Sequence, residues 1–521
     1  MTTEILDVLI IGAGVSGIGM ACTLKTRCPD KSYLILESRE RLGGTWDLFR
    51  FPGVRSDSDM HTYAYGFRPW SAFKLLGDGA EIRTYLAETA RESGIERHIR
   101  YNVRIRRADW SSITQLWTLQ AENGADQQPM RFRCRYLVMG TGYYDYQTGH
   151  TPAIPGLDSF AGRVIHPQHW PEDFDHAGKR VVVVGSGATA VTLVPAMAQT
   201  ASHVTMLQRS PTYLLSMPRK DVVSRLLSTV LPARWVFAAA RRLNTFAPAF
   251  IYRASRRWPA ALRRLLLAGV RAQLKGAADM RHFQPRDQPW DQRLCAVADG
   301  DLFERIRAGK AEVVTDDIEQ VEANGVRLHS GRRLDADVLV TATGLNLQAF
   351  GGIALYVDGL RYQPGEHLLY RAVLPEGLPN LAWIIGYINH SWTLRADMAT
   401  AYVCRLLQHM DAHGQTVAVA HDQEGCVTEG SIMSALNAGY VHRSSNAIPR
   451  QGRKAPWRVT HDLRDDRRLL LEEPIDDGIL QFKCEAAVGR SARLESCGAE
   501  ALAPTPLHTG QSTGGPYIPQ S

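Results

Sequence analysis

Short apolar runs are followed by helical patterns at two widely separated places in the chain. Residues 6–11 form the first run, and a helical pattern follows it as far as residue 24. Residues 180–184 form the second run, which contains four consecutive valines. In each case another strand-like run follows, at residues 31–36 and 204–207. Strand, helix and strand in this order predict parallel β-α-β units with right-handed crossovers, so we expect an α/β fold built on two such units.

The first run leads directly into a glycine pattern of the kind that binds dinucleotides. Its spacing is Gly12-x-Gly14-x-x-Gly17, and the next strand closes on Glu37, twenty residues past the last glycine. Such glycines allow a tight turn, a close approach of the backbone to a pyrophosphate and close packing of the helix on the strand. A carboxylate at the position of Glu37 can accept hydrogen bonds from a ribose 2′-hydroxyl. The first unit is therefore predicted to bind a dinucleotide.

The second run leads into a related pattern with a different ending. Gly185-x-Gly187-x-x-Ala190 is followed by a strand that ends near Arg209 and Ser210 instead of at an acid. A cation there suits a ribose 2′-phosphate, which a carboxylate would repel. Two sites with different ribose preferences imply two dinucleotides, and a flavin beside a nicotinamide is the pair in which one reduces the other. The alternative is one working site and one relic of a duplication.

Composition narrows the class of protein. The 521 residues suggest two or three domains, and 45% hydrophobic and 22% charged residues are typical of a globular chain. Eight scattered cysteines without a C-x-x-C pair predict reduced thiols and no metal site. No apolar run approaches the ~20 residues of a membrane span, and no signal segment is recognised. We therefore expect a cytoplasmic protein.

Basic charge is concentrated between residues 219 and 281. This segment contains 14 Lys or Arg and two Asp, a charge of +12, so the overall +7 leaves −5 for the rest. Within residues 260–275 a helical spacing predicts an apolar side made of Leu262, Leu265, Leu266 and Gly269, opposite Arg264, Arg271 and Lys275. The simplest interpretation is a helical insertion with a solvated basic face. The alternative is an interfacial region attracted to anionic lipid or to a pool of hydrophobic substrate, which would make the protein peripheral to the inner face of the plasma membrane. No motif supports binding of nucleic acid.

Three further motifs carry a family resemblance. Gly43-Gly44-Thr45-Trp46 and Pro52-Gly53-Val54-Arg55-Ser56-Asp57 follow the first unit. Between the units stands a pattern of five fixed positions, Phe160, Gly162, His166, Trp170 and Pro171. This pattern resembles the fingerprint of the type I Baeyer–Villiger monooxygenases, within the class B flavoprotein monooxygenases, and its Trp-Pro ending distinguishes it from the related flavin-containing monooxygenases.

The resemblance covers residues 5–480. It continues through residues 337–344, a strand and turn expected to return the chain to the flavin. Residues 289–295 and 391–397 are most similar to the branch of the ethionamide-activating monooxygenases.

The resemblance implies cofactors and site residues. FAD would sit on the first unit and NADPH on the second. Residues implied to contact FAD are Gly12, Gly14, Gly17, Glu37, Gly44, Thr45, Trp46 and Asp57, and those implied to contact NADPH are Gly185, Gly187, Ala190, Arg209 and Ser210. Arg293 matches the catalytic arginine over the flavin, and Asp57 matches the carboxylate that pairs with it. Many members carry Lys before this arginine where this chain has Gln292, so the preference for NADPH rests mainly on Arg209.

The implied activity is oxygen insertion next to a ketone carbonyl. O2 would add to the reduced flavin to give a C4a-peroxyflavin, the ketone would become an ester, and oxidation of thioethers or thioamides would be a second activity. Arg293, a permanent cation, would stabilise the developing oxyanion. His166 is interpreted as a hydrogen-bonded linker residue. The alternatives are an N- or S-oxygenating flavin monooxygenase, a flavin reductase or NADPH oxidase, and a non-catalytic dinucleotide-binding protein held on membranes.

Domain boundaries follow from these assignments. Residues 1–147 and 333–483 are expected to form the FAD domain, with the NADP domain at residues 148–332 inserted between them. A basic helical insertion, at about residues 214–281, would interrupt the NADP domain. The tail at residues 484–521, rich in Ala, Gly, Ser, Thr and Pro, is expected to be disordered.

Overall fold

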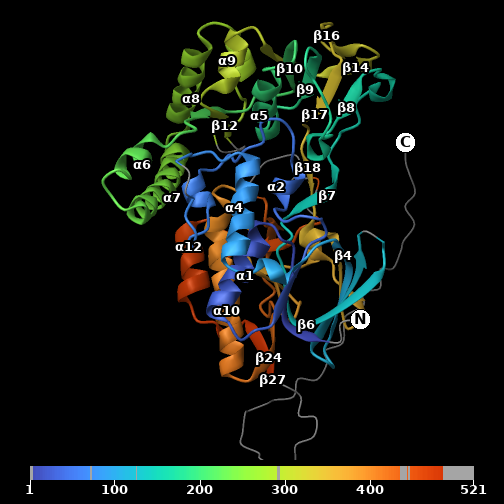
Figure 1. The fold of residues 1–521 in the computed structure, drawn as a ribbon, viewed down its shortest axis with the longest axis vertical. Helices are drawn as coiled ribbons and strands as arrows, with labels where there is room; N and C mark the ends of the chain where they lie inside the picture. Colours follow the sequence, from blue (N-terminus) through green and yellow to red (C-terminus); the bar gives the residue numbers. More distant parts are fainter. Residues whose placement is uncertain are drawn as a thin grey trace, which may run out of the picture. The chain divides into compact units, whose positions relative to one another are not determined.

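We describe the fold from a computed structural model of the chain. The structure describes residues 4–70, 73–124, 126–289, 294–434, 443 and 446–484. Two regions for which the sequence makes predictions lie outside these ranges, namely the segment with Arg293, the predicted catalytic residue, and the tail from residue 485 on. Residues up to Cys484 form one compact unit that contains two large sheets, one above the other in Figure 1.

The lower sheet of Figure 1 begins with the first β-α-β unit. Among the described residues its strands are, in spatial order, β20 (Leu360–Arg361), β19 (Ala354–Val357), β4 (Val103–Ser111), β5 (Leu116–Asn123), β6 (Pro129–Met139), β1 (Ile5–Ile11), β2 (Tyr33–Leu36) and β3 (Ile99–Arg100), and β23 (Leu381–Trp383) pairs with the end of β6. β1 runs parallel to both β2 and β6, as the predicted β-α-β unit requires. The β4–β5–β6 part is antiparallel.

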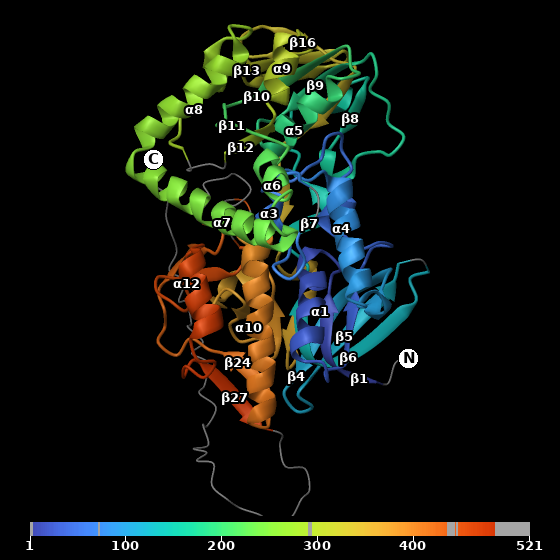
Figure 2. The same ribbon diagram turned by 60° about the vertical axis from the view of Figure 1, so that its left-hand side comes forward.

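Both faces of this sheet are buried. Successive side chains of a strand point to opposite faces, so Val8 and Ile10 join one apolar cluster while Leu9 and Ile11 join another. Helices α1 (Val15–Arg27) and α10 (Trp392–Ala412) cover the first face, as Figure 2 shows. Burial on both faces explains why the strands read as continuous apolar runs.

The upper sheet is entirely parallel. Its spatial order is β13 (Ala311–Thr315), β10 (His203–Gln208), β9 (Arg180–Val184), β17 (Val338–Thr341) and β8 (Arg163–Ile165). The valines of β9 alternate between two clusters, with Val181 and Val183 under helix α5 (Ala188–Met197) and Val182 on the opposite face. The second predicted β-α-β unit is therefore present, and the α/β fold class is confirmed.

The chain crosses between the two sheets twice, and the two crossings lie side by side. β7 (Tyr144–Gly149) leads upward and pairs antiparallel with β18 (Leu345–Leu347), which leads back. The structure differs here from the predicted boundary between residues 332 and 333, because β17 still belongs to the upper sheet. Its buried Val338, Leu339 and Val340 require neighbours on both sides, which β9 and β8 supply. The return crossing therefore begins only after Thr341.

The basic segment forms helices α6 (Val222–Leu227), α7 (Ala233–Arg257) and α8 (Pro259–Leu274). On α8 the predicted apolar side is partly wrong. Leu265 and Gly269 are exposed, while Leu266, Val270 and Leu274 are buried at a spacing of four residues. No helix of the described residues is long and apolar enough to cross a membrane.

Smaller elements complete the described part. The remaining helices are α2 (Thr45–Leu48), α3 (Met60–Tyr63), α4 (Gly79–Glu92), α9 (Asp301–Arg307) and α12 (Leu463–Arg467). The remaining strands are β11 (Leu214–Met217) with β12 (Cys295–Ala298), β14 (Ile318–Glu322) with β15 (Gly325–Leu328) and β16 (Arg333–Asp335), β21 (Leu369–Tyr370) with β22 (Leu374–Pro375), β24 (Gln415–Ala420) with β27 (Leu480–Cys484), and β25 (Thr428–Ser431) with β26 (Arg450–Gly452).

Candidate cofactor sites and active site

The two predicted glycine loops have the same backbone design. Gly12 has φ +98° and Gly185 φ +137°, values that L side chains rarely adopt. The Gly12 amide donates to the Leu36 carbonyl, and the Gly185 amide donates to the Leu207 carbonyl, both at 2.8 Å. Each loop is thus tied to the end of the neighbouring strand. The helix that follows begins with its free amide groups at the carboxyl edge of the sheet, where a phosphate binds most favourably.

The middle glycine of each loop is required neither by the backbone conformation nor by the packing of the protein itself. Gly14 and Gly187 have ordinary backbone angles, φ −86° and φ −77°. A Cβ built on Gly187 would meet no atom within 4 Å, and one on Gly14 would meet only Gly44, at 3.5 Å. By contrast, a Cβ on Gly17 would lie 1.8 Å from the Gly12 carbonyl oxygen. Gly17 therefore serves helix packing, whereas Gly14 and Gly187 leave room for a closely approaching ligand, as a pyrophosphate requires.

Glu37, the predicted ribose acceptor, directly follows β2 and lies beside the first glycine loop. Its carboxylate accepts hydrogen bonds from the Ala13 amide at 2.7 Å and from the Arg39 amide at 2.9 Å, and burial raises its pKa. It lines a cavity of about 200 Å³ together with Gly12. This cavity shares five lining residues with a larger one of about 270 Å³, namely Gly14, Gly44, Gly140, Tyr144 and Tyr146. The two cavities form a continuous slot, which fits an elongated dinucleotide such as FAD.

The loop that carries Gly44, Thr45 and Trp46 is held in place by the buried carboxylate of Asp47. The Asp47 side chain is fully buried, and Arg39 donates to it from two nitrogens, at 2.7 and 3.0 Å. Three more guanidinium groups lie within 3.5 Å of it, those of Arg41, Arg50 and Arg83. This network fixes the loop that forms one wall of the slot.

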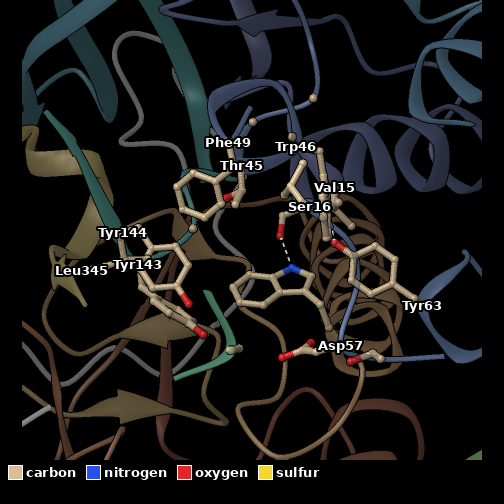
Figure 3. A pocket seen from close by; sticks show the side chains of 18 of the residues that line it. Val15, Ser16, Thr45, Trp46, Phe49, Asp57, Tyr63, Tyr143, Tyr144 and Leu345 are labelled. Carbon is tan, nitrogen blue, oxygen red and sulfur yellow. Dashed lines mark hydrogen bonds between the residues drawn. The ribbon is translucent and has the colours of Figure 1, made fainter. Parts of the chain in front are cut away.

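The larger cavity is lined mainly by aromatic and hydroxyl side chains (Figure 3). The Trp392 indole donates to the Ser16 hydroxyl at 2.9 Å, and the Trp46 indole donates to the Tyr63 hydroxyl at 2.6 Å. The Trp392 ring also lies 5.2 Å from the ring of Tyr143. Hydrogen-bonded and edge-packed rings of this kind form an aromatic wall, which suits a planar ring system such as a flavin.

Both dinucleotide units contribute to this one cavity. We call the lower sheet with its helices the lower unit and the upper sheet with its helices the upper unit. The lower unit contributes Gly14, Val15 and Ser16 at the start of α1, and the upper unit contributes Ala188 and Thr189 at the start of α5. A ligand held at either helix terminus therefore reaches the same space. Hydride transfer between two bound cofactors needs such a meeting point, because the reacting atoms must come within about 3–3.5 Å.

The segment before Asp57 binds the two units together. Phe51 is part of the apolar core of the upper unit, and a Cβ on Gly53 would lie 2.7 Å from the Cβ of Ala196 on α5. The buried Arg55 guanidinium donates to the Asp301 carboxylate at 2.9 Å, and Asp301 begins α9. Asp57 follows at the cavity wall. The structure thus places Asp57 at the junction of both units.

The predicted phosphate-binding residues lie at the end of β10. Arg209 and Ser210 are both exposed. The Ser186 hydroxyl donates to the Ser210 carbonyl at 3.1 Å, which ties this end to the second glycine loop. Ala190 is buried in the first turn of α5. An exposed guanidinium beside the loop is available to a 2′-phosphate, in keeping with the predicted role of Arg209.

The fingerprint residues lie before and after β8, the edge strand of the upper sheet, beside the crossing. His166 contacts the β7–β18 pair, since its Nε2 lies 3.1 Å from the Gly344 carbonyl oxygen and a Cβ on Gly149 would lie 2.0 Å from its ring. Its Nδ1 accepts a hydrogen bond from the Gln168 amide at 3.2 Å, and burial lowers its pKa. The histidine side chain thus contacts the crossing, where its ring bonds to backbone groups. The remaining fingerprint residues support the same region: Phe160 is buried, Gly162 is close to the Asp337 carbonyl, Trp170 packs on Phe174, and Pro171 follows. None of these five residues lines either cavity.

Several cavity residues have no counterpart in the sequence predictions. Tyr146 reaches both cavities, its hydroxyl lies 2.9 Å from that of Thr45, and burial raises its pKa to about 12. Tyr387 comes from the loop before α10. A lone tyrosine in a loop carries no local signal, so only the fold brings these two residues to the cavity. Arg293 lies outside the described residues, and its pairing with Asp57 remains a prediction.

Comparisons with known proteins agree with this geometry. Residues 6–412 match the model of the flavin-binding monooxygenase-like family. The chain is 53% identical over 484 residues to the FAD-containing monooxygenase MymA of Mycobacterium tuberculosis, covering 92% of this chain and 98% of that protein. It is 47% identical over 490 residues to the FAD-containing monooxygenase EthA of the same organism, covering 94% and 100%.

A solved structure matches over nearly the same span. The structure of an oxidised steroid monooxygenase bound to NADP superposes with a TM-score of 0.73 at 20% identity, covering 92% of this chain and all of that one. The chain therefore belongs to the flavin-binding monooxygenase-like family and is a flavin-dependent monooxygenase with the two-dinucleotide fold of the Baeyer–Villiger type.

Proposed function

We propose that this monooxygenase uses FAD and NADPH to insert one oxygen atom of O2 next to a ketone carbonyl, giving an ester, and that it also oxygenates thioethers or thioamides. The observation that carries the proposal is the single cavity into which both dinucleotide helices open, with Asp57 at its wall. The comparisons support it, because the relatives are FAD-containing monooxygenases and the matching structure holds NADP.

Each cofactor has a set of residues that fits it. The amides at the start of α1 and the space beside Gly14 suit the FAD pyrophosphate, and Glu37 suits a ribose of FAD. The amides at the start of α5 and the space beside Gly187 suit the NADPH pyrophosphate, with Arg209 beside its 2′-phosphate. Bound flavin, once reduced by NADPH, supplies the activated oxygen.

The protein's own groups exclude water and polarise the substrate. Tyr143, Trp46 and Trp392 form an aromatic lining, which keeps bulk water from a reactive centre and strengthens electrostatic contacts within the cavity. Arg293 is predicted to stabilise the negative charge that develops on the substrate carbonyl oxygen. A guanidinium suits this role because it stays charged at any working pH. Asp57 would hold that guanidinium in place through a charge-assisted pair.

A substrate panel tests the proposal directly. Purified FAD-loaded protein is supplied with NADPH and 18O2, and with aliphatic ketones, aryl ketones or thioethers, and the products are identified by mass spectrometry. Ester carrying one 18O atom per molecule is the expected product. Sulfoxide without ester would instead identify an S-oxygenating flavin monooxygenase, and H2O2 without any oxygenated product would identify an oxidase.

A variant pair tests the role of Arg293. Arg293→Ala is expected to keep FAD bound and reducible by NADPH while ester formation falls by at least about 100-fold, the usual cost of removing a donor to a developing oxyanion. Arg305→Ala, an exchange of an arginine on α9, is the matched control and should keep ester formation. Ester formation near the wild-type rate in Arg293→Ala would show that the arginine has another role.

A further inference from the structure

Exposed apolar side chains gather on the basic insertion. Of the nineteen large apolar side chains that are exposed among the described residues, eleven lie between residues 222 and 265. The concentration is highest around α6, where Val223 is 68% exposed, Leu226 64% and Val230 77%. Patches of this kind are rare on a freely soluble surface and mark sites of interaction.

The following helix continues the same surface. Trp235, Leu243 and Phe246 are exposed on α7, and a helical rotation of about 100° per residue places them within one side of the helix. Phe237 lies on the other side and is buried. We call residues 222–235, together with this exposed side of α7, the apolar tip. In Figure 1 α6 and α7 lie at the left edge of the described part, away from β4 and β6.

Unpaired cations accompany the apolar tip. Eight of the fourteen Lys and Arg between residues 219 and 281 are exposed and make no ion pair with any carboxylate in the part of the chain that the structure describes. Arg225, Arg234 and Arg242 are the three that lie within the apolar tip itself. The two acids of the segment are engaged elsewhere, Asp221 with His61 and Asp279 with Arg281. The surface is therefore both apolar and strongly positive.

The apolar tip is anchored firmly to the lower unit. Asp221 caps α6 by accepting from the Ser224 amide at 2.9 Å, and its other oxygen lies 2.5 Å from Nε2 of the buried His61. Arg241 of α7 donates to the carbonyls of His61 at 2.9 Å and Ala64 at 2.7 Å. These contacts lie on the inner side of the insertion, so they leave the exposed side chains of the apolar tip unused.

We propose that the apolar tip is a docking surface for a lipid bilayer rich in anionic headgroups. Apolar side chains would enter the boundary between headgroups and acyl chains, while the surrounding cations would contact lipid phosphates. A second copy of the chain is disfavoured, because a symmetric interface would bring like charges face to face. Nucleic acid attracts cations but offers no partner for exposed Val and Leu side chains.

The docking surface adjoins the wall of the larger cavity. α7 packs against α3, whose last residue, Tyr63, lines that cavity. Arg241 of α7 donates to the carbonyls of His61 and Ala64, which lie on either side of Tyr63 in the sequence. An enzyme bound in this way meets apolar compounds at the high concentration that they reach in lipid. This position therefore favours lipophilic ketones and sulfides as substrates. That conclusion rests on the proposed function, whereas the docking itself does not.

Vesicle flotation tests the docking surface without an activity readout. The FAD-loaded full-length protein is mixed with vesicles of phosphatidylcholine alone or with added phosphatidylglycerol. We expect flotation with the anionic vesicles only, and its loss at high salt, because the screening length shortens from about 10 Å at 0.1 M to about 3 Å at 1 M. Failure to float with anionic vesicles at low salt would overturn the proposal.

Two sets of variants locate the surface. The triple variant Val223→Asp, Leu226→Asp, Val230→Asp should lose flotation, while Ile113→Asp, at a 94% exposed position in the β4–β5 turn, should keep it. Neutralising Arg225, Arg234 and Arg242 to Gln should weaken binding about 100-fold, since each cation near an anionic bilayer contributes a factor of about five.

Further controls separate docking from folding and from self-association. The same exchange at three exposed cations elsewhere, Lys310, Arg361 and Lys483, should leave binding unchanged. All variants should keep bound FAD and wild-type NADPH consumption in solution. If the Asp variants still float, or if they only turn a dimer into a monomer while the wild-type protein ignores vesicles, the lipid assignment is wrong.

Discussion

Gly187→Ala separates ligand binding from folding at the second glycine loop. The added methyl group meets no protein atom within 4 Å, and the backbone angle of φ −77° is one that alanine adopts freely. Alanine is a poorer N-cap than glycine by about 1 kcal/mol, but it restricts the unfolded chain by about as much, and the two effects oppose each other. The free energy of unfolding should therefore change by less than about 1 kcal/mol.

The effect on NADPH should be much larger. The methyl group occupies the space through which a pyrophosphate approaches the first amides of α5. Losing hydrogen bonds to a charged group costs about 1.5–3 kcal/mol, which corresponds to a dissociation constant raised about 10- to 150-fold. The assay is anaerobic flavin reduction at increasing NADPH concentration, with thermal unfolding measured on the same samples. FAD content should stay as in the wild-type protein.

Two further glycine exchanges serve as controls. Gly269→Ala lies on the exposed side of α8, where a Cβ meets nothing within 4 Å, so it should stabilise the helix by about 1 kcal/mol and leave NADPH binding unchanged. Gly185→Ala should damage the fold itself, because its Cβ would lie 2.3 Å from the Ala342 carbonyl oxygen. An unchanged NADPH dissociation constant in a stable Gly187→Ala variant would refute the assignment of this loop to the pyrophosphate.

Three other exchanges probe the site for the 2′-phosphate, the junction of the two units and a buried carboxyl group on α10. Arg209→Ala should raise the KM for NADPH about tenfold or more and that for NADH little, since only NADPH carries the 2′-phosphate; equal changes in steady-state assays would contradict the role. Arg55→Met should lower the free energy of unfolding by about 2 kcal/mol, because the partly buried Asp301 loses its partner, and a double-mutant cycle with Asp301→Asn in urea unfolding should reveal the coupling. Burial raises the pKa of Asp397 from 3.8 to about 6, so the folded protein holds a proton there that the unfolded chain releases, and stability should fall by about 2 kcal/mol as pH rises from 4 to 7. Asp397→Asn should remove this part of the pH dependence, and an unchanged pH profile of thermal unfolding would exclude the carboxyl group as its source.

Local patterns in the sequence were sufficient for the parts of the site that local geometry determines. Gly12 forms a turn with φ near +100°, and Gly17 lies where a helix starts close to a strand. Only glycine fits at these two positions. Those residues therefore reveal the loop wherever the chain places it. Glu37 and Arg209 are predictable for the same reason, since each follows the strand that lies beside its loop.

Nonlocal packing decided the parts that the sequence predictions missed. On α8 both Leu265 and Val270 fit a helical stripe with Leu266, and only the packing of α8 against α9 and β11 selects Val270 for burial. Strand β17 pairs with strands more than 150 residues earlier in the chain, so its membership in the upper sheet is not visible from its own residues. Tyr387 reaches the cavity for the same reason, because its position depends on where α10 packs.

The segment from Phe51 to Asp57 contacts both units, so the orientation of one unit relative to the other determines where Asp57 lies in the site. Phe51 and Gly53 fix it to the upper unit, while the Ser56 amide donates to the Gly77 carbonyl of the lower unit at 2.8 Å. A rotation of one unit against the other must therefore move Asp57 or break these contacts. Packed contacts of this kind have few alternative arrangements, so the position of Asp57 and the distance between the two glycine loops change together. It follows that a substitution which loosens this segment should uncouple NADPH consumption from oxygenation even when both cofactors still bind.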